Sequence, residues 1–142
     1  MKYTVDDIDI YIMTHNRADY LMLSIESMLN QSAGVSKITV LDNESTDNTL
    51  SAVERFSSRG VRYIRTKGFL GNFKKAQEIA SGKYVMLFHD DDILHPLYLE
   101  LALQVLNEKD DISLITTRYT EFFDDDFPGM PESIVPDYYY FE

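Results

Sequence analysis

Short apolar runs typical of strands alternate with amphipathic runs typical of helices along most of this chain. The strand-like runs are 7–14, 37–42, 61–65, 83–89 and 112–119. The helix-like runs are 18–31, 47–60, 71–82 and 96 to about 107. Alternation of this kind favours strand–helix–strand units and a parallel sheet, and nearly continuous apolar strands are those that helices cover on both faces. The sequence therefore predicts an α/β fold, with a mostly parallel sheet flanked by helices.

Length and composition bound the class of protein. The chain has 142 residues, of which 44% are hydrophobic and 13% aromatic, so it can bury a core and is not intrinsically disordered. It has no cysteine, which excludes disulfides and thiolate metal sites. No apolar run approaches the roughly 20 residues of a membrane-spanning helix, and "MKYTVDDIDI" lacks the apolar core of a signal peptide. We expect a cytoplasmic protein, either free or peripheral to the inner face of a membrane.

Acidic residues are concentrated in the C-terminal part. The segment 1–88 has 11 basic and 10 acidic residues, whereas 89–142 has 2 basic and 14 acidic residues. A nucleic-acid-binding surface needs the opposite balance, so nucleic acid is not an expected partner. After residue 120 the chain becomes rich in proline, acids and aromatics. We expect 1–120 to form the domain and 121–142 an extension that lies on the sheet or on a partner, such as the second copy of a homodimer.

A polar segment follows each of the first four predicted strands. The segments are "THNR" (14–17), "DNESTD" (42–47), "TKGFLGN" (66–72) and "HDDD" (89–92). The carboxyl ends of parallel strands meet at one edge of the sheet, and ligands bind there, at the point where strand order reverses. We therefore expect all four segments to line one site.

The chemistry of these segments is complementary. Three adjacent aspartates, 90–92, repel one another unless a cation is present, and carboxylate oxygens suit Mg²⁺ or Mn²⁺ bound to a diphosphate. Asp42 is suited to accept hydrogen bonds from a nucleobase or ribose. The amides of Gly68 and Gly71 can approach phosphates closely. Six basic residues between Arg59 and Lys75 offer one or two cations for an anionic ligand.

Each segment taken alone also has a structural interpretation. Ser45 or Asp47 would cap the second helix, Asn16 would cap the first, and the aspartates would gain from a helix N-terminus. His89 and His95 are expected to be polar loop residues. A response-regulator-like domain is disfavoured, because it needs an acidic pair after the first strand and a phosphorylatable aspartate after the third.

The ordered set "IYIMTHNRADYLMLSIESMLNQS", "ITVLDNESTDNT" and "GNFKKAQEIASGKYVMLFHDDDILHP" resembles the family 2 glycosyltransferases over residues 8 to about 106. The resemblance implies the Rossmann-like GT-A fold and a nucleotide-diphospho-sugar donor, with a UDP-sugar favoured. By the same resemblance Asp91 would bind Mn²⁺ or Mg²⁺ as the aspartate of the family's D-x-D motif, whose first position here is His89. The residues that would bind the nucleotide are Thr14, Asn16, Arg17, Asp42, Glu44, Asn72 and Asp90.

The implied reaction is inverting, metal-dependent transfer of a sugar to an acceptor saccharide, a lipid-linked saccharide or a protein. Relatives continue into an acceptor-binding half that carries the general base, and no counterpart is recognisable in this chain. Three acids, 124–126, follow the last predicted strand, but their position assigns them no role. We therefore expect the donor-binding half of the machinery with weak transfer or none. The alternative is a non-catalytic nucleotide-sugar-binding module, which a transfer assay would distinguish.

Overall fold

Four parallel strands form the sheet of this protein. The computed structural model describes residues 1–68, 70–109, 111–117, 119 and 121–123. The strands are β1 (Ile8–Thr14), β2 (Ile38–Asn43), β3 (Val61–Thr66) and β4 (Tyr84–His89). Their order across the sheet is β3-β2-β1-β4, so the direction of winding reverses between β1 and β4. The predicted mostly parallel α/β fold is confirmed.

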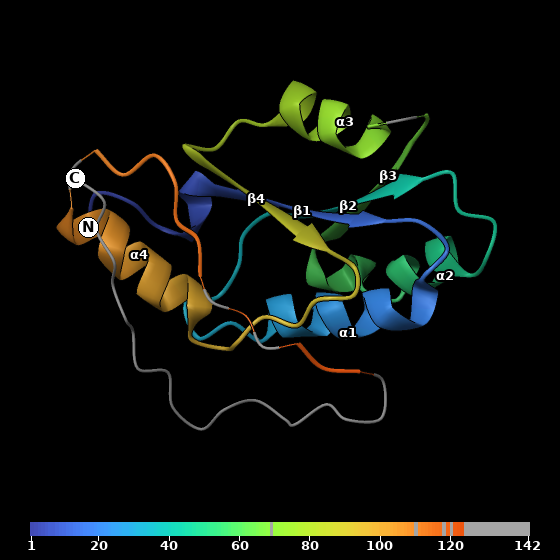
Figure 1. Cartoon of the computed structure of the whole chain (residues 1–142), viewed down its shortest axis with the longest axis horizontal. Coiled ribbons are helices and arrows are strands. Elements are labelled where there is room, and N and C mark those ends of the chain that lie inside the picture. The colour runs from blue at the N-terminus through green and yellow to red at the C-terminus, as the bar shows by residue number, and fades with distance from the viewer. Residues whose placement is uncertain (69, 110, 118, 120, 124–142) are drawn as a thin grey trace.

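Helices cover both faces of the sheet. The helices α1 (Ala18–Leu29), α2 (Thr49–Glu54) and α4 (Tyr98–Glu108) lie on one face, and α3 (Gly71–Ile79) lies on the other (Figure 1). Two short 3-10 helices, η1 (Val5–Asp7) and η2 (Ser57–Arg59), precede β1 and β3. None of the helices in the described part of the chain is long and apolar enough to span a membrane.

The larger core lies between the sheet and the three-helix face. Leu21, Ile25 and Met28 of α1 are completely buried against Ile10, Ile12 and Val40 of the sheet, together with side chains of α2 and α4. Burial of each such side chain stabilises the fold by about 1.5–3 kcal/mol. A smaller cluster of Tyr11, Leu41 and Ala76 packs α3 onto the other face. The two clusters therefore hold the helices on the faces of the sheet and not across the edge formed by the carboxyl ends of the strands.

Several predicted boundaries need correction. The helix predicted over 47–60 is α2 followed by a turn and η2, and it stops at Gly60, which has a left-handed φ of 86°. The strand predicted over 112–119 is wrong, because none of its described residues belongs to the sheet. Leu114 and Tyr119 are 78% and 83% exposed. Strand propensity reflects fit to a half-buried pleated surface, and the described chain does not supply that cover here.

Candidate functional site

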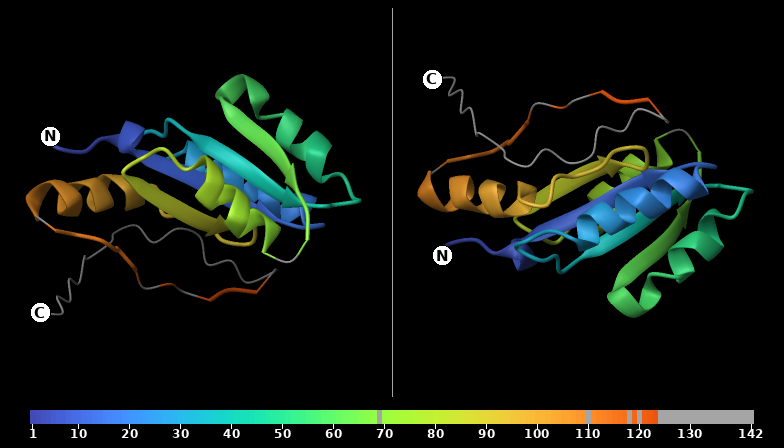
Figure 2. Two further views of the ribbon diagram at one scale, coloured as in Figure 1. Left: turned by 90° about the horizontal axis from the view of Figure 1, so that it is seen from above. Right: turned by 90° about the horizontal axis from the view of Figure 1, so that it is seen from below.

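The carboxyl ends of the four strands lie at the same end of the sheet, on the right in Figure 1, and Figure 2 shows the same arrangement from above and below. Because strand order reverses between β1 and β4, the segments after these two strands face each other across the opening where ligands bind in such sheets. This confirms the prediction that the polar segments share one edge.

An arginine and two aspartates meet at this opening. Arg17 Nη1 donates to Asp91 Oδ2 at 2.5 Å and to Asp90 Oδ1 at 3.3 Å. The Asp90 side chain is only 5% exposed, whereas Asp91 and Arg17 are 48% and 50% exposed. Asp90 and then Asp91 raise the pKa of Arg17. Two carboxylate oxygens from adjacent residues thus converge on one cationic group.

Asp92, the third aspartate, lies outside this ion-paired group. Burial raises the pKa of Asp92, the charges of Asp91 and Asp90 raise it further, and His89 opposes the effect. The carboxylates of the cluster therefore differ: Asp90 and Asp91 share the Arg17 cation, whereas the pKa of Asp92 is raised, first by desolvation and then by the neighbouring negative charges.

The inner face of α1 holds the aspartate segment in place. Ser24 Oγ donates to the carbonyl of His89 at 3.1 Å, and Ser27 Oγ accepts from the amide of Leu94 at 3.1 Å. Gln31, just after α1, donates to the carbonyl of His95 at 2.9 Å and accepts from the amide of Leu99 at 3.0 Å. These three side chains were not predicted from the sequence. The sequence feature that they share is a spacing of three and four residues, which places polar side chains on the apolar face of α1 and directly after it.

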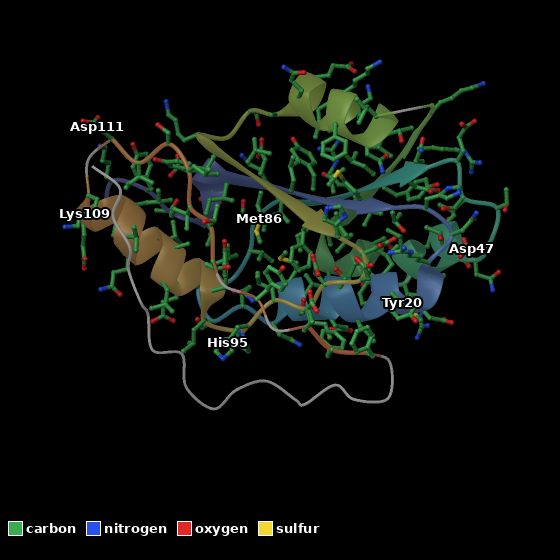
Figure 3. All side chains as sticks on the ribbon, in the orientation of Figure 1. Tyr20, Asp47, Met86, His95, Lys109 and Asp111 are labelled. Carbon is green, nitrogen blue, oxygen red and sulfur yellow. The ribbon has the colours of Figure 1, made fainter. Side chains whose placement is uncertain are left out.

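Two histidines flank the aspartate segment. His89 lies at the end of β4 and is exposed, and His95 lies on the segment before α4 (Figure 3). His95 Nδ1 accepts a hydrogen bond from the amide of Leu97 at 3.1 Å. This is a local loop contact, as the sequence analysis expected for His95.

Asp42, at the end of β2, is buried and its carboxylate is held by the protein itself. Oδ1 accepts from the amide of Ser45 at 3.0 Å and from its hydroxyl at 2.5 Å, and Oδ2 accepts from the hydroxyl of Tyr63 at 2.5 Å. Burial and the bond to Asp42 raise the pKa of Tyr63 to about 12. Asp42 therefore shapes the segment after β2, and its contact with a base stays a prediction.

The segments after β1 and β2 are joined to each other. Asn16 adopts a left-handed φ of 54°; its amide donates to Ser45 Oγ at 2.8 Å, and its Oδ1 accepts from the amide of Thr46 at 2.7 Å. The interpretation of Asn16 as the cap of α1 is wrong, because its side chain turns to the neighbouring segment. Backbone strain of this kind clusters at ligand sites, and Glu44 is also left-handed, with φ of 61°.

Asp47 lies beside the N-terminal ends of α1 and α2 (Figure 3). Its carboxylate accepts from the amide of Ala18 at 3.2 Å and from the amide of Thr49 at 3.0 Å. Burial alone would raise the pKa of Asp47, but the hydrogen bonds from Thr49 and Ala18 outweigh it and lower the pKa. The prediction that Asp47 is the cap of the second helix needs correction, because the N-cap of α2 is Asn48, which makes no side-chain cap hydrogen bond. Asp47 lies one residue before this cap, and its carboxylate binds the first amide of α2 and the first turn of α1.

Two buried polar atoms at the carboxyl ends of strands have no hydrogen-bond partner among the described residues. They are Thr14 Oγ1, at the end of β1, and Asn43 Oδ1, at the end of β2. An unpaired buried polar atom is rare and costs about 1–3 kcal/mol, so its presence at a strand end favours a ligand. Thr14 was predicted from the sequence as a site residue, but Asn43 was not, although it lies next to Asp42 at a strand end.

A basic pocket of about 460 Å³ lies between the end of β3 and the start of α3. It is lined by Glu44, Arg65, Thr66, Lys67, Gly71, Lys74, Lys75 and Glu78. A Cβ on Gly71 would lie 3.3 Å from Asn43 Oδ1, so glycine allows α3 to start close to β2. Asn72 accepts from Thr66 Oγ1 and donates to the carbonyl of Thr14 at 3.5 Å, which ties α3 to the ends of β3 and β1.

The aspartate pair fits a divalent cation shared with a diphosphate. Asp90 and Asp91 present oxygens to one cationic position, and oxygen is the ligand that Mg²⁺ and Mn²⁺ prefer. Among the described residues, no group of three or more histidine, cysteine, aspartate or glutamate side chains is arranged to hold a metal. One or two carboxylates are the usual protein contribution where substrate phosphates complete the shell.

A parallel sheet with helices on both faces and a reversal of strand order defines an open α/β fold, in which ligands bind outside the carboxyl ends of the strands. The family model described as "Glycosyl transferase family 2" matches residues 9–141. The chain therefore belongs to glycosyltransferase family 2, and the family predicted from the sequence is confirmed.

Individual relatives agree with this family. An uncharacterized glycosyltransferase of Haemophilus influenzae is 30% identical over 111 residues, which are 75% of this chain and 34% of that protein. The chain thus spans about a third of the length of that relative.

Solved structures show the same fold. TarS 1–349 of S. aureus, in complex with UDP, aligns with a TM-score of 0.64 and 22% identity, over 72% of this chain and 32% of that one. The mannosyltransferase PcManGT of Pyrobaculum calidifontis, in complex with GDP-Man and Mn²⁺, aligns with a TM-score of 0.56 and 22% identity, over 68% and 30%. The GT-A fold predicted from the sequence is confirmed.

Proposed function

We propose that this chain binds a UDP-sugar together with a divalent cation at the open edge of its sheet, as the donor half of a metal-dependent, inverting glycosyltransferase. The observation that carries the proposal is the pair of carboxylates, Asp90 and Asp91, which converge on one cationic position at the point where strand order reverses. The bound nucleotides and Mn²⁺ named for TarS and PcManGT support it.

The residues divide into two groups along the edge. Asp91, which is half exposed, would hold the cation, and the buried Asp90 would lie against both the cation and the ribose. Thr14 Oγ1 and Asn43 Oδ1, to which no described residue supplies a hydrogen-bond partner, would form hydrogen bonds with the nucleoside. Glu44 and Asn72 lie at the rim of this region, so their predicted roles in nucleotide binding fit the same placement.

The bound cation would supply Lewis acidity that stabilises the departing diphosphate. The protein's own part is to position the donor and to keep positive charge near the leaving group. The complete transfer also needs a carboxylate that removes the proton of the acceptor hydroxyl. The acids 124–126 lie outside the described residues, and no general base is assigned. Acceptor, cytoplasmic location and homodimer formation stay predictions.

Calorimetric titration of UDP, with and without Mn²⁺, tests the donor site directly. We expect binding that depends on Mn²⁺ and that Asp91→Asn weakens by at least about tenfold, because one carboxylate ligand of the cation is lost. Asp19→Asn, which removes the same charge from the first turn of α1, is the matched control. UDP binding that is independent of both Mn²⁺ and Asp91 would refute the metal-dependent site.

Parallel titrations with GDP and dTDP test the choice of base. Preference for UDP supports the uracil-type assignment, whereas tighter binding of GDP would correct it. A transfer assay with UDP-sugars then separates a donor half that acts on acceptors from a module that only binds the donor.

A further inference from the structure

Arg17 occupies the position that the cation of the proposed donor site needs. We propose that Arg17 is a built-in counter-ion, which neutralises Asp90 and Asp91 in the free protein and is displaced from them when the metal-bound diphosphate enters. This inference rests on the proposed function and adds a step to it: binding exchanges one cation for another at the same carboxylates.

The contact distances make the two cations mutually exclusive. Arg17 Nη1 lies 2.5 Å from Asp91 Oδ2 and 3.3 Å from Asp90 Oδ1, so one nitrogen is in contact with both oxygens. A Mg²⁺ ion needs oxygens at about 2.0–2.1 Å in an octahedral shell. An ion on these oxygens would therefore overlap the guanidinium, which has to move first.

Burial explains why the free protein needs a counter-ion here. The Asp90 side chain is 5% exposed, and a buried carboxylate without a partner is strongly unfavourable. The Arg17 and Asp91 side chains are about half exposed, so solvent screens their pair and keeps it weak. The pairing is thus favourable enough to form and weak enough to be displaced.

Displacement requires only a change of side-chain rotamer. The backbone around Arg17 is anchored: Asn16 is bonded to Ser45 and Thr46, and the carbonyl of Arg17 accepts from the amide of Leu21 at 2.9 Å. A released guanidinium would remain beside the incoming diphosphate. The planar guanidinium is well suited to donate to phosphate oxygens. The positive charge that leaves the aspartates would therefore pair with the diphosphate.

Opposite changes in two affinities distinguish this role from simple support of the loop. Without nucleotide, Arg17→Gln should bind Mn²⁺ about three- to tenfold more tightly than the wild type, because the competing cation is gone. With Mn²⁺ present, the same variant should bind UDP about three- to tenfold more weakly, because the phosphate loses an arginine. A residue that only supports the aspartate segment would weaken both affinities when removed.

The affinity for Mn²⁺ is measured on the full chain without nucleotide. The chain is titrated with Mn²⁺, and electron paramagnetic resonance measures the concentration of the free ion. Arg59→Gln is the matched control, because Arg59 forms a similar half-exposed pair with Glu26 at 2.8 Å; it should leave Mn²⁺ affinity unchanged. The double variant Arg17→Gln, Asp91→Asn should lose the gain, which assigns it to these carboxylates. Circular dichroism verifies the fold of each variant.

The outcomes separate the two proposals. Mn²⁺ affinity that rises about threefold or more in Arg17→Gln, but not in Arg59→Gln, supports the counter-ion role. An unchanged or weaker Mn²⁺ affinity in a folded Arg17→Gln overturns it, whatever UDP does. Failure of UDP to bind the wild type with Mn²⁺ refutes the proposed function instead, since the measurement with the metal alone involves no nucleotide.

Discussion

Replacement of Asp9 by asparagine tests how the fold holds the end of the sheet opposite the proposed site. Asp9 lies buried on β1, and its Oδ2 accepts from the amides of Ser81 and Gly82 at 2.6 and 2.7 Å. Lys37 Nζ lies 3.2 Å from Oδ1. One carboxylate therefore joins β1, the start of β2 and the connection from α3 to β4. Asparagine keeps its shape and removes its charge.

The contacts set the size of the effect. A hydrogen bond to a charged acceptor contributes about 1.5–3 kcal/mol and a neutral one about 0.5–1.5 kcal/mol, so each of the two amide bonds weakens by about 1 kcal/mol. The Lys37 side chain is 45% exposed, which limits its pair to at most about 1 kcal/mol. Asparagine also removes the cost of burying a charge, which reduces the loss of stability. We expect Asp9→Asn to lower the free energy of unfolding by about 2 kcal/mol at pH 7.

The pH dependence checks the cause. Burial raises the pKa of Asp9, but the amides of Ser81 and Gly82 and the charge of Lys37 outweigh it, so the pKa lies below its ordinary value of 3.8. As the pH falls, the Asp9 carboxylate is therefore protonated at a higher pH in the unfolded chain than in the folded protein. The stabilisation is complete above about pH 3.8 and is lost as pH falls through the lower pKa of the folded state.

Urea unfolding followed by circular dichroism at pH 7, 5.5 and 3.5 measures this difference. The gap between wild type and Asp9→Asn should be equal at the two higher pH values and smaller at pH 3.5. Asp6→Asn, at an exposed position nearby, should change stability by less than about 0.5 kcal/mol. Equal stability of Asp9→Asn and wild type at pH 7, or a gap that does not shrink at pH 3.5, would refute the reasoning.

Three further substitutions test other parts of the structure by urea unfolding. Gly82→Ala should destabilise by about 1–3 kcal/mol, because its Cβ would lie 2.7 Å from the carbonyl oxygen of Asp7, a backbone atom that cannot rotate away; wild-type stability would contradict that geometry. Gln31→Leu should cost about 2 kcal/mol, because the amide of Leu99 loses its buried acceptor, and a smaller loss would mean that water replaces it. Thr14→Val should leave stability unchanged or raise it by up to about 1 kcal/mol, since Thr14 Oγ1 has no hydrogen-bond partner in the described part of the chain. The same change should weaken UDP binding several-fold in calorimetry, and undiminished binding would remove Thr14 from the site.

Much of the fold followed from local pattern. The amphipathic run 18–31 predicted α1, and the apolar strands predicted a covered, parallel sheet; both are confirmed. The strand predicted from "ISLITTRY" was wrong, because the pattern cannot show whether a neighbouring element covers it. Buried polar contacts were missed for a related reason: Ser24 and Gln31 look like ordinary helix residues until the aspartate segment lies against them.

The sequence by itself determined which residues stand at strand ends, because side-chain periodicity and the polar segments between apolar runs are local properties. Only the tertiary structure decided which of those ends face each other. Arg17 and Asp91 are separated by 74 residues, and nothing in their local sequence pairs them. They meet because burial of both sheet faces places β4 beside β1, in the order β3-β2-β1-β4, and so brings a cation into contact with carboxylates that would otherwise repel one another.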